Sequence, residues 1–397
     1  MWTLLGVALT APGQVIPGLR TIVTSPGILI SDYVDLAGLG PSLVNSGLVA
    51  LVGVGLAALF GARSLGVVIA AVFTMAGFAL FGKNVFNIWP GFVGVYLYHR
   101  YTGRPMSELT TPLLFGTTLA PLVSQIAFGF TSSPWAIVAG ILAGVLAGFM
   151  VSAMAAHILS IHFGYNLFNI GLTGGFISMV FFALTKALGW QYSGAAYWST
   201  QHTLTFALVL GALLASMIVL GCWWGASVAG LRSIMSHSGK LVTDYVEIAG
   251  LGSSLVNMGV VGSICLAYVL LIRGPISGPV AGAILTLAGF GALGAHARNS
   301  VPVMLGVFLM SLPMVWSATE PGPLLAALFC IGLCPIAGRY GFLAGVLAGM
   351  LHLPVVMHTA ATYGWMNLYN NGFAGALVAM VFLGFLKGCR PDLVQDC

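Results

Sequence analysis

The stretch SDYVDLAGLGPSLVNSGLVA, residues 31–50, has a second copy in this chain. Residues 243–262 read TDYVEIAGLGSSLVNMGVVG, and thirteen of the twenty positions are identical at a constant offset of 212. The same offset extends to the GFALFGKNVFNIWP run at 77–90, and an offset of 201 holds later, where LAGVLAG at 142–148 recurs. Self-similarity over such lengths indicates an internal duplication. We therefore expect two copies of one structural unit.

The composition predicts that lipid surrounds most of the chain. Of its 397 residues, 59% are hydrophobic and 5% are charged, whereas about 25% of the residues in a soluble domain are charged. Backbone groups in lipid need internal partners, which leaves helices or closed barrels, and the continuous apolar runs here lack the alternation of barrel strands. We predict an all-α polytopic membrane protein with about 10–13 membrane segments, several of them short and therefore re-entrant or broken.

The duplication divides the chain into five parts. Many duplicated transporters use inverted repeats, and we expect inversion here, although Arg63 and Arg273 hold near-equivalent positions and give no opposite charge bias. A full apolar segment precedes the second copy, so we expect the first copy to begin with a truncated helix. The predicted parts are an N-terminal segment at 1–24, membrane repeat 1 at 25–187, a linker and connecting helix at 188–236, membrane repeat 2 at 237–387 and a C-terminal tail at 388–397.

Four of the eight acidic residues lie in the repeated DYV(D/E) motif, namely Asp32, Asp35, Asp244 and Glu247. In a helix, acids three residues apart share one face, and acids inside a membrane domain are typical of ion or proton coupling. The alternative is an interfacial turn, in which the acids favour a helix N-terminus and the neighbouring tyrosines anchor at the lipid headgroups. The sequence leaves both interpretations open.

Neutral polar side chains interrupt the apolar runs at matching points of the two copies. Glycine, asparagine and proline together indicate broken helix, which at membrane depth must line a cavity or be buried in protein. The alternatives are helix caps formed by asparagine, hydrogen bonds between helices and, around Lys83, an ordinary surface loop. We predict a pore or substrate-binding role for Ser42, Asn45, Lys83, Asn84, Asn87, Asn166, Asn169, Ser254, Asn257, His296, Asn299, Asn367 and Asn370.

Histidine and cysteine give no metal-binding pattern. Cys330 and Cys334 lie four residues apart in an apolar run and are typical of buried small side chains. The sequence contains no P-loop, GxSxG, HExxH or paired CxxC motif. We therefore expect no metal, no cofactor and no enzymatic activity. The formal charge of +5 is spread over loops and helix ends, which favours a topology signal over nucleic-acid binding.

Three runs resemble a duplicated bacterial inner-membrane family described as a domain of unknown function. They are TSPGILISDYVDLAGLG at 24–40, GFALFGKNVFNIWP at 77–90 and FGTTLAP at 115–121. The resemblance covers nearly the whole chain and implies a multi-pass protein of the cell inner (plasma) membrane, with no known substrate.

The order of Ser42–Gly47 and Gly82–Asn87 is also similar to the half-helix architecture of urea transporters. The N-P-L-S-G signature of those channels is missing here, so no binding residue is carried over. That architecture implies a neutral-solute pore within each protomer of a trimer.

These patterns favour a membrane channel or facilitator for a small polar solute or ion, with its path between the two repeats. The first alternative is a secondary transporter coupled to H⁺ or Na⁺ through the four acids of the repeated motif. The second alternative, from another class, is a membrane-embedded enzyme or an assembly scaffold. The predicted partners are the lipid bilayer, a small polar solute or ion and further copies of the chain in a dimer or trimer.

Overall fold

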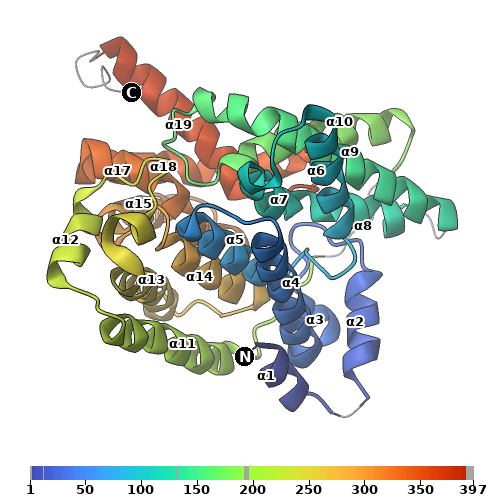
Figure 1. Ribbon diagram of the computed structural model, residues 1–397, viewed down its shortest axis with the longest axis horizontal. Coiled ribbons are helices and arrows are strands. Elements are labelled where there is room, and N and C mark those ends of the chain that lie inside the picture. The colour runs from blue at the N-terminus through green and yellow to red at the C-terminus, as the bar shows by residue number, and fades with distance from the viewer. Residues whose placement is uncertain (1, 12, 131–132, 192–195, 390–397) are drawn as a thin grey trace.

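The computed structural model describes residues 2–11, 13–130, 133–191 and 196–389. Regular structure in these ranges is helical, and β-type pairing is limited to three isolated bridges. The helices of the first half (Figure 1) are α1 (Trp2–Ala8), α2 (Val15–Val23), α3 (Tyr33–Ala37), α4 (Leu39–Leu59), α5 (Leu65–Phe78), α6 (Trp89–Thr102), α7 (Thr110–Phe115), α8 (Ala120–Phe128), α9 (Pro134–Ile161) and α10 (Asn169–Ala187). Those of the second half are α11 (Thr203–Trp223), α12 (Val228–Ser236), α13 (Tyr245–Leu271), α14 (Gly278–Phe290), α15 (Ala297–Ser311), α16 (Pro321–Phe329), α17 (Cys334–Tyr340), α18 (Phe342–Thr359) and α19 (Asn370–Cys389).

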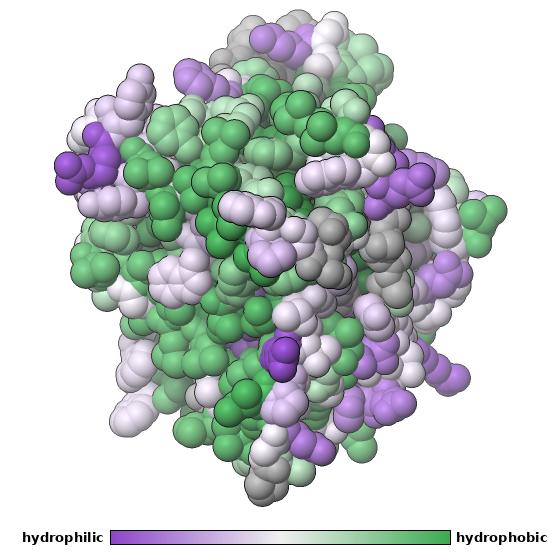
Figure 2. Space-filling model, turned by 90° about the vertical axis from the view of Figure 1, so that its right-hand side faces the viewer, coloured by the Kyte–Doolittle hydropathy of each residue, from purple (hydrophilic) through white to green (hydrophobic). Residues whose placement is uncertain are grey.

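The helices are those of a multi-pass membrane protein. Nine helical segments of the described chain are long and apolar enough to cross a bilayer, and α2, α5 and α14 are shorter apolar helices. Nine and three give twelve apolar segments, which agrees with the predicted range. On the face drawn in Figure 2, hydrophobic side chains cover broad areas and hydrophilic ones stand in smaller groups.

Two of the nine segments are broken in their middle. The 3₁₀ turns Gly116–Leu119 and Cys330–Leu333 interrupt the segments Thr110–Phe128 and Pro321–Tyr340. Irregular backbone at membrane depth must be covered by protein, and these two segments are 89% and 83% buried within the molecule. The broken helices predicted from the sequence are therefore present, and they lie inside the bundle rather than against lipid.

The two copies contain equivalent helices in the same order, which confirms the duplication. The pairs are α4 and α13, α5 and α14, α6 and α15, α9 and α18, and α10 and α19. The short α1 takes the place against α4 that the end of α11 takes against α13. A Cβ on Gly6 would lie 2.6 Å from the carbonyl oxygen of Gly40, and one on Gly221 would lie 2.6 Å from that of Gly252.

Equivalent helices of the two repeats cross each other at the centre. A Cβ on Gly77 in α5 would lie 2.2 Å from the carbonyl oxygen of Gly282 in α14, so only glycine permits this approach. The equivalents of these two positions, Gly289 and Ala70, also meet, because a Cβ on Gly289 would lie 3.3 Å from the Ala70 Cα. The contacts pair the end of one helix with the start of the other. α5 and α14 are therefore antiparallel about a pseudo-two-fold axis, as expected for inverted repeats.

Candidate functional site

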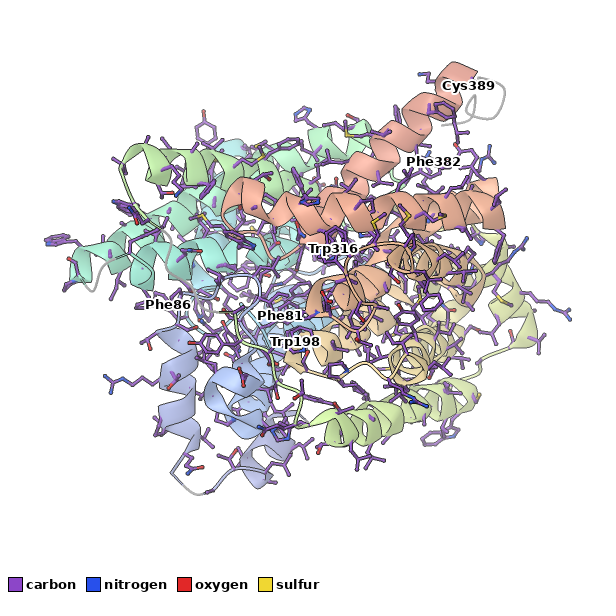
Figure 3. All side chains as sticks on the ribbon, turned by 180° about the vertical axis from the view of Figure 1, so that it is seen from behind. Phe81, Phe86, Trp198, Trp316, Phe382 and Cys389 are labelled. Atoms are coloured by element: carbon purple, nitrogen blue, oxygen red, sulfur yellow. The ribbon has the colours of Figure 1, made fainter. Side chains whose placement is uncertain are left out.

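The acidic motif of the first repeat caps a helix of the second repeat. Asp32 accepts hydrogen bonds from the backbone N–H groups of Val34 at 2.9 Å, Ser199 at 2.9 Å and Gly278 at 3.2 Å. Gly278 is the first residue of α14, and Figure 3 labels Trp198, next to Ser199, near the middle of the bundle. Burial raises the pKa of the Asp32 carboxyl to about 6, although the three N–H donors oppose the rise.

The second repeat returns the same contact. Asp244 accepts hydrogen bonds from the backbone N–H of Gly66 at 3.0 Å and from Ser64 Oγ at 2.5 Å, at the start of α5. Gly66 is equivalent to Gly278 at the offset of 212. Each carboxylate thus stabilises the N-terminus of a half-helix of the opposite repeat, where the helix dipole favours a negative charge.

The other two acids of the motif, Asp35 and Glu247, are exposed. Asp35 Oδ2 accepts a hydrogen bond from the backbone N–H of Trp198 at 3.3 Å. Helix capping therefore describes Asp32 and Asp244, both of which are buried within the protein.

Asn45 and Asn257 hold the chain that follows α5 and α14. Asn45 Nδ2 donates to the carbonyl oxygens of Ala79 and Lys83 at 2.7 and 2.9 Å, and Asn257 makes the two equivalent bonds at 2.7 and 2.9 Å. The carbonyls at a helix C-terminus lack intrahelical partners, and these amides supply them. Both asparagines are buried.

The next polar cluster closes the same loops. Asn87 and Asn299 each donate to the carbonyl oxygen of the glycine five residues earlier, both at 2.9 Å. Asn84 Oδ1 and His296 Nδ1 accept from the backbone N–H of Asn87 and Asn299, at 2.9 and 3.3 Å. All four side chains are buried. The loops are thus held within the protein by their own side chains, and they are not surface loops.

Asn166 and Asn367 join the two repeats. Asn166 Nδ2 donates to the carbonyl oxygen of Gly372 at 2.7 Å, and Asn367 Nδ2 donates to that of Gly171 at 3.0 Å. The four positions form two equivalent pairs at the offset of 201. α10 and α19 also meet here, because a Cβ on Gly171 would lie 2.8 Å from the Gly372 Cα. The pseudo-two-fold axis therefore passes between these glycines.

Of the remaining five predicted residues, all but Lys83 make hydrogen bonds within their own repeat or none. Asn169 and Asn370 donate to backbone carbonyls of the helix preceding each of them, at 3.1 and 3.0 Å. Ser42 Oγ donates to a carbonyl oxygen at the start of α4, at 2.7 Å, whereas Ser254 Oγ is buried without a hydrogen-bond partner.

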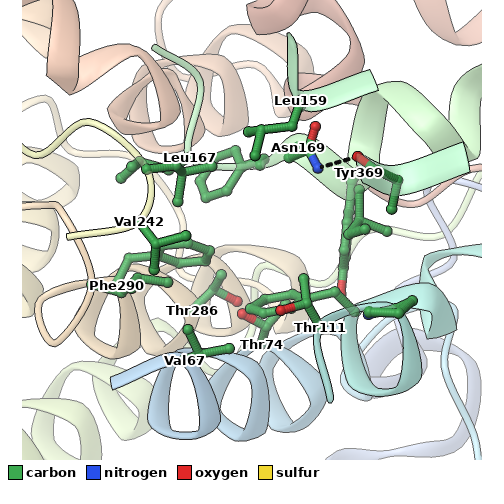
Figure 4. Close-up of a pocket in the computed structure, with 18 of the residues that line it drawn as sticks. Val67, Thr74, Thr111, Leu159, Leu167, Asn169, Val242, Thr286, Phe290 and Tyr369 are labelled. Carbon is green, nitrogen blue, oxygen red and sulfur yellow. Dashed lines mark hydrogen bonds between the residues drawn. The ribbon is translucent and has the colours of Figure 1, made fainter. Parts of the chain in front are cut away.

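A cavity of about 230 Å³ lies on the pseudo-two-fold axis (Figure 4). α5 and α14 contribute the equivalent residues Thr74 and Thr286 to its lining. A cavity of this size has room for several waters or one small solute. Three equivalent pairs of aromatic rings complete the core of the lining, namely Phe78 and Phe290, Phe115 and Phe329, and Phe168 and Tyr369.

The ring contacts repeat across the axis. The centroids of Phe78 and Tyr369 lie 4.8 Å apart, and those of the equivalent pair, Phe290 and Phe168, also lie 4.8 Å apart. The two repeats thus build the walls of the cavity from the same positions.

The lining reaches the surface on one side of the axis. Arg104, Glu108 and Val242 belong to the lining and are exposed, Val242 by 65%. The equivalent of Val242 in the first repeat is Ile30, which packs against the hydrophobic core and does not line the cavity. The inner lining is buried, with Thr74 at 2% and Thr286 at 1% exposure. The lining of the cavity therefore reaches the surface at Val242 and does not extend to the equivalent position, Ile30.

Lys83 lies behind a buried wall of this cavity. Its side chain is 0% exposed, and Nζ donates to the hydroxyl of Tyr369 at 2.6 Å. Nζ also lies 4.7 Å from the ring centroid of Tyr369 and 5.3 Å from that of Phe78. No carboxylate of the described chain lies within ion-pair distance of Lys83. The amino group of Lys83 thus contacts two aromatic rings and one hydroxyl, and burial lowers its pKa well below the ordinary value.

A family model described as "Protein of unknown function (DUF1576)" matches residues 11–187 and 225–388. The chain belongs to the DUF1576 family. The two matched ranges contain the two repeats of this DUF1576 protein, and they begin before the boundaries of 25 and 237 predicted from the sequence. The same comparisons found no similar curated protein and no similar solved structure. The resemblance of this chain to urea transporters stays a prediction.

Sequence reasoning found one lining residue of this DUF1576 protein. Asn169 lies in the cavity wall, and Lys83 lies directly behind it. The predicted role of the other polar residues in a path stays a prediction, while their hydrogen bonds fit the capping alternative. The aromatic lining was missed. Its signal was the recurrence of Phe78 as Phe290 at the offset of 212 and of Phe168 as Tyr369 at the offset of 201.

Proposed function

We propose that this DUF1576 protein is a facilitator that moves a small solute through the cavity between its repeats. The observation that carries the proposal is a cavity on the pseudo-two-fold axis whose lining reaches the surface at Val242 and not at the equivalent Ile30. Substrate sites of transporters with internal repeats lie at the repeat interface. A structural core would have no need of an opening there.

The one-sided opening favours a carrier over an open channel. Val242 borders the open mouth, while its equivalent Ile30 packs against the core. If the two repeats exchanged these arrangements, the mouth would close and the opposite exit would open. Alternating access of this kind is the expected motion of an inverted-repeat carrier.

The acids of the repeated motif do not favour ion coupling as the primary role. Asp32 and Asp244 cap helices through several hydrogen bonds each, and Asp35 and Glu247 are exposed. A facilitator needs none of them for coupling, so solute entry should require no ion gradient.

The test compares open and plugged protein in vesicles without an ion gradient. Vesicles that contain the wild type or Thr74→Trp, whose indole would fill the cavity, are incubated with a polar metabolite extract. Mass spectrometry of the washed vesicles should find solutes that enter with the wild type and stay outside with the variant. Thr21→Trp, on an exposed part of α2, is the matched control.

A second way to block the cavity acts after the protein has folded. Val242→Cys is modified at the mouth with a bulky maleimide after reconstitution, and wild-type protein treated alike controls for the exposed Cys222 and Cys389. The block should exclude the same solutes as Thr74→Trp. Identical contents in the open and blocked vesicles would overturn the proposed transport.

A further inference from the structure

The chemistry around Lys83 differs between the two repeats, although the backbone does not. The backbone N–H of Lys83 donates to the carbonyl of Phe78 at 3.1 Å, and its equivalent Ala295 donates to that of Phe290 at 3.1 Å. The carbonyls of Lys83 and Ala295 both accept from an asparagine at 2.9 Å. The backbone conformation therefore does not require a lysine at position 83, because Ala295 adopts it at the equivalent position.

The partner of Lys83 breaks the symmetry in the same corner. Tyr369, which holds the Lys83 ammonium at 2.6 Å, is equivalent to Phe168. One corner of the cavity thus has a lysine and a tyrosine, and the equivalent corner has Ala295 and Phe168. A buried cation is costly unless it is compensated. Its presence in one repeat alone indicates a task other than folding.

The charges near the cavity favour an anion. Glu108 is the only acid in the described lining, and it lies between Arg104 at 3.8 Å and Arg63 at 3.7 Å. These three side chains carry a net charge of +1 at the mouth, and a protonated Lys83 adds a second positive charge behind the inner wall. Coulomb attraction acts strongly where protein excludes water, so the field inside attracts a negative group and repels a positive one.

We infer that the solute is a small amphipathic monoanion, such as a carboxylate on an apolar body. This inference rests on the proposed function and names the class of its substrate. The apolar body packs among the aromatic rings of the lining. The anionic group lies at Tyr369, whose ring stands along one side of the cavity (Figure 4).

Lys83 acts on the anion through this tyrosine. The Tyr369 hydroxyl accepts a hydrogen bond from Lys83 Nζ and has the Thr117 side chain as a second hydrogen-bond neighbour, so its own O–H would turn from Thr117 to the bound solute. Burial lowers the pKa of the Lys83 amine, and a bound anion opposes that change, so the anion and the protonated amine stabilise each other and strengthen the second bond. Lys83 is therefore a specificity-determining residue behind the cavity wall, and Tyr369 is the residue that contacts the anion.

The test uses three single-ring probes of similar size and different charge. Benzoate, benzamide and benzylammonium are titrated by calorimetry into the full-length protein in detergent, so the readout does not depend on transport. The wild type should bind benzoate at least about tenfold more tightly than benzamide, and benzylammonium most weakly. Lys83→Met should bind benzoate and benzamide equally, with the benzamide affinity of the wild type.

Matched variants separate charge from folding. Lys186→Met removes one positive charge from the exposed end of α10 and should keep the wild-type preference. Unchanged benzamide binding shows that Lys83→Met has folded, and if that variant does not fold, Tyr369→Phe should still weaken the preference for benzoate.

Three results would overturn the inference: equal binding of benzoate and benzamide, a preference for benzylammonium, or no benzoate binding by the wild type. Cavity-dependent entry of neutral or cationic metabolites in the vesicle test would do so too, while leaving the facilitator in place. Equal vesicle contents with selective benzoate binding would remove the transport role alone.

Discussion

The carboxylate of Asp32 lies 3.2 Å from the backbone nitrogen of Gly278, the first residue of a helix in the other repeat. The mirrored contact joins Asp244 and Gly66 at 3.0 Å. Because α5 and α14 are antiparallel, the two caps lie at opposite ends of the central helix pair. Each repeat therefore completes a helix of its partner.

Replacing Asp32 should destabilise the protein. Asp32→Ala leaves three backbone N–H groups without their acceptor and should cost about 2–4 kcal/mol of unfolding free energy. Thermal unfolding in detergent measures the loss. Asp35→Ala, at an exposed position three residues away, should change it by less than about 0.5 kcal/mol. Equal effects of the two substitutions would contradict the cap across the repeats.

The crossing of α5 and α14 should tolerate no side chain at Gly77. Gly77→Ala places a Cβ against the Gly282 carbonyl and should cost about 1–3 kcal/mol through overpacking. Gly55→Ala, in α4 with open space around the new Cβ, should be neutral or slightly stabilising, because alanine favours helix. Midpoints of chemical unfolding compare the two, and a stable Gly77→Ala protein would argue against the close crossing.

Lys83 and Tyr369 should be coupled in stability. Tyr369→Phe removes the hydroxyl that holds the buried ammonium, at a cost of about 1–3 kcal/mol. Lys83→Met removes the charge itself and should cost little, since an apolar group of similar size replaces a buried ion. In the double variant the penalty of Tyr369→Phe should largely vanish. A double-mutant cycle checks this, and additive effects would mean that the hydroxyl stabilises something other than Lys83.

The charge at the mouth should tune affinity without changing the fold. Glu108→Gln frees Arg63 and Arg104 from their shared acid, and exposed ion pairs contribute little to stability. We expect an unchanged unfolding midpoint and benzoate binding that is tighter by less than about fivefold. The gain should fade at high salt because the mouth is solvated. A gain that resists salt would place the effect away from the mouth.

The sequence predicted the architecture better than the site. Two copies with broken helices follow from the offsets and from the chemistry of lipid. The role of Asn45 did not follow from the sequence, because an amide in an apolar run can line a solute path or bond the free carbonyls at a helix end equally well. The hydrogen bonds of Asn45 to the carbonyls of Ala79 and Lys83 fit the helix-end alternative, and only the packed structure places these carbonyls beside the amide.

The aromatic lining was hidden by composition. In a chain with 23 phenylalanines, Phe78 and Phe290 look like any residue that faces lipid. Their role depends on the antiparallel crossing of α5 and α14, which brings equivalent positions to one axis. The hydrophobic periodicity of a single helix does not reveal which helix crosses it.

The exchanged caps also bear on how the protein is made. When the first half leaves the ribosome, Gly278 and Asp244 have not yet been synthesised. Asp32 then lacks the N–H donor of Gly278, and the N-terminus of α5 lacks the carboxylate of Asp244. The first repeat therefore cannot form its complete set of helix caps until the second repeat has entered the membrane. Expressed as two separate polypeptides, the halves would have to find each other before either could mature.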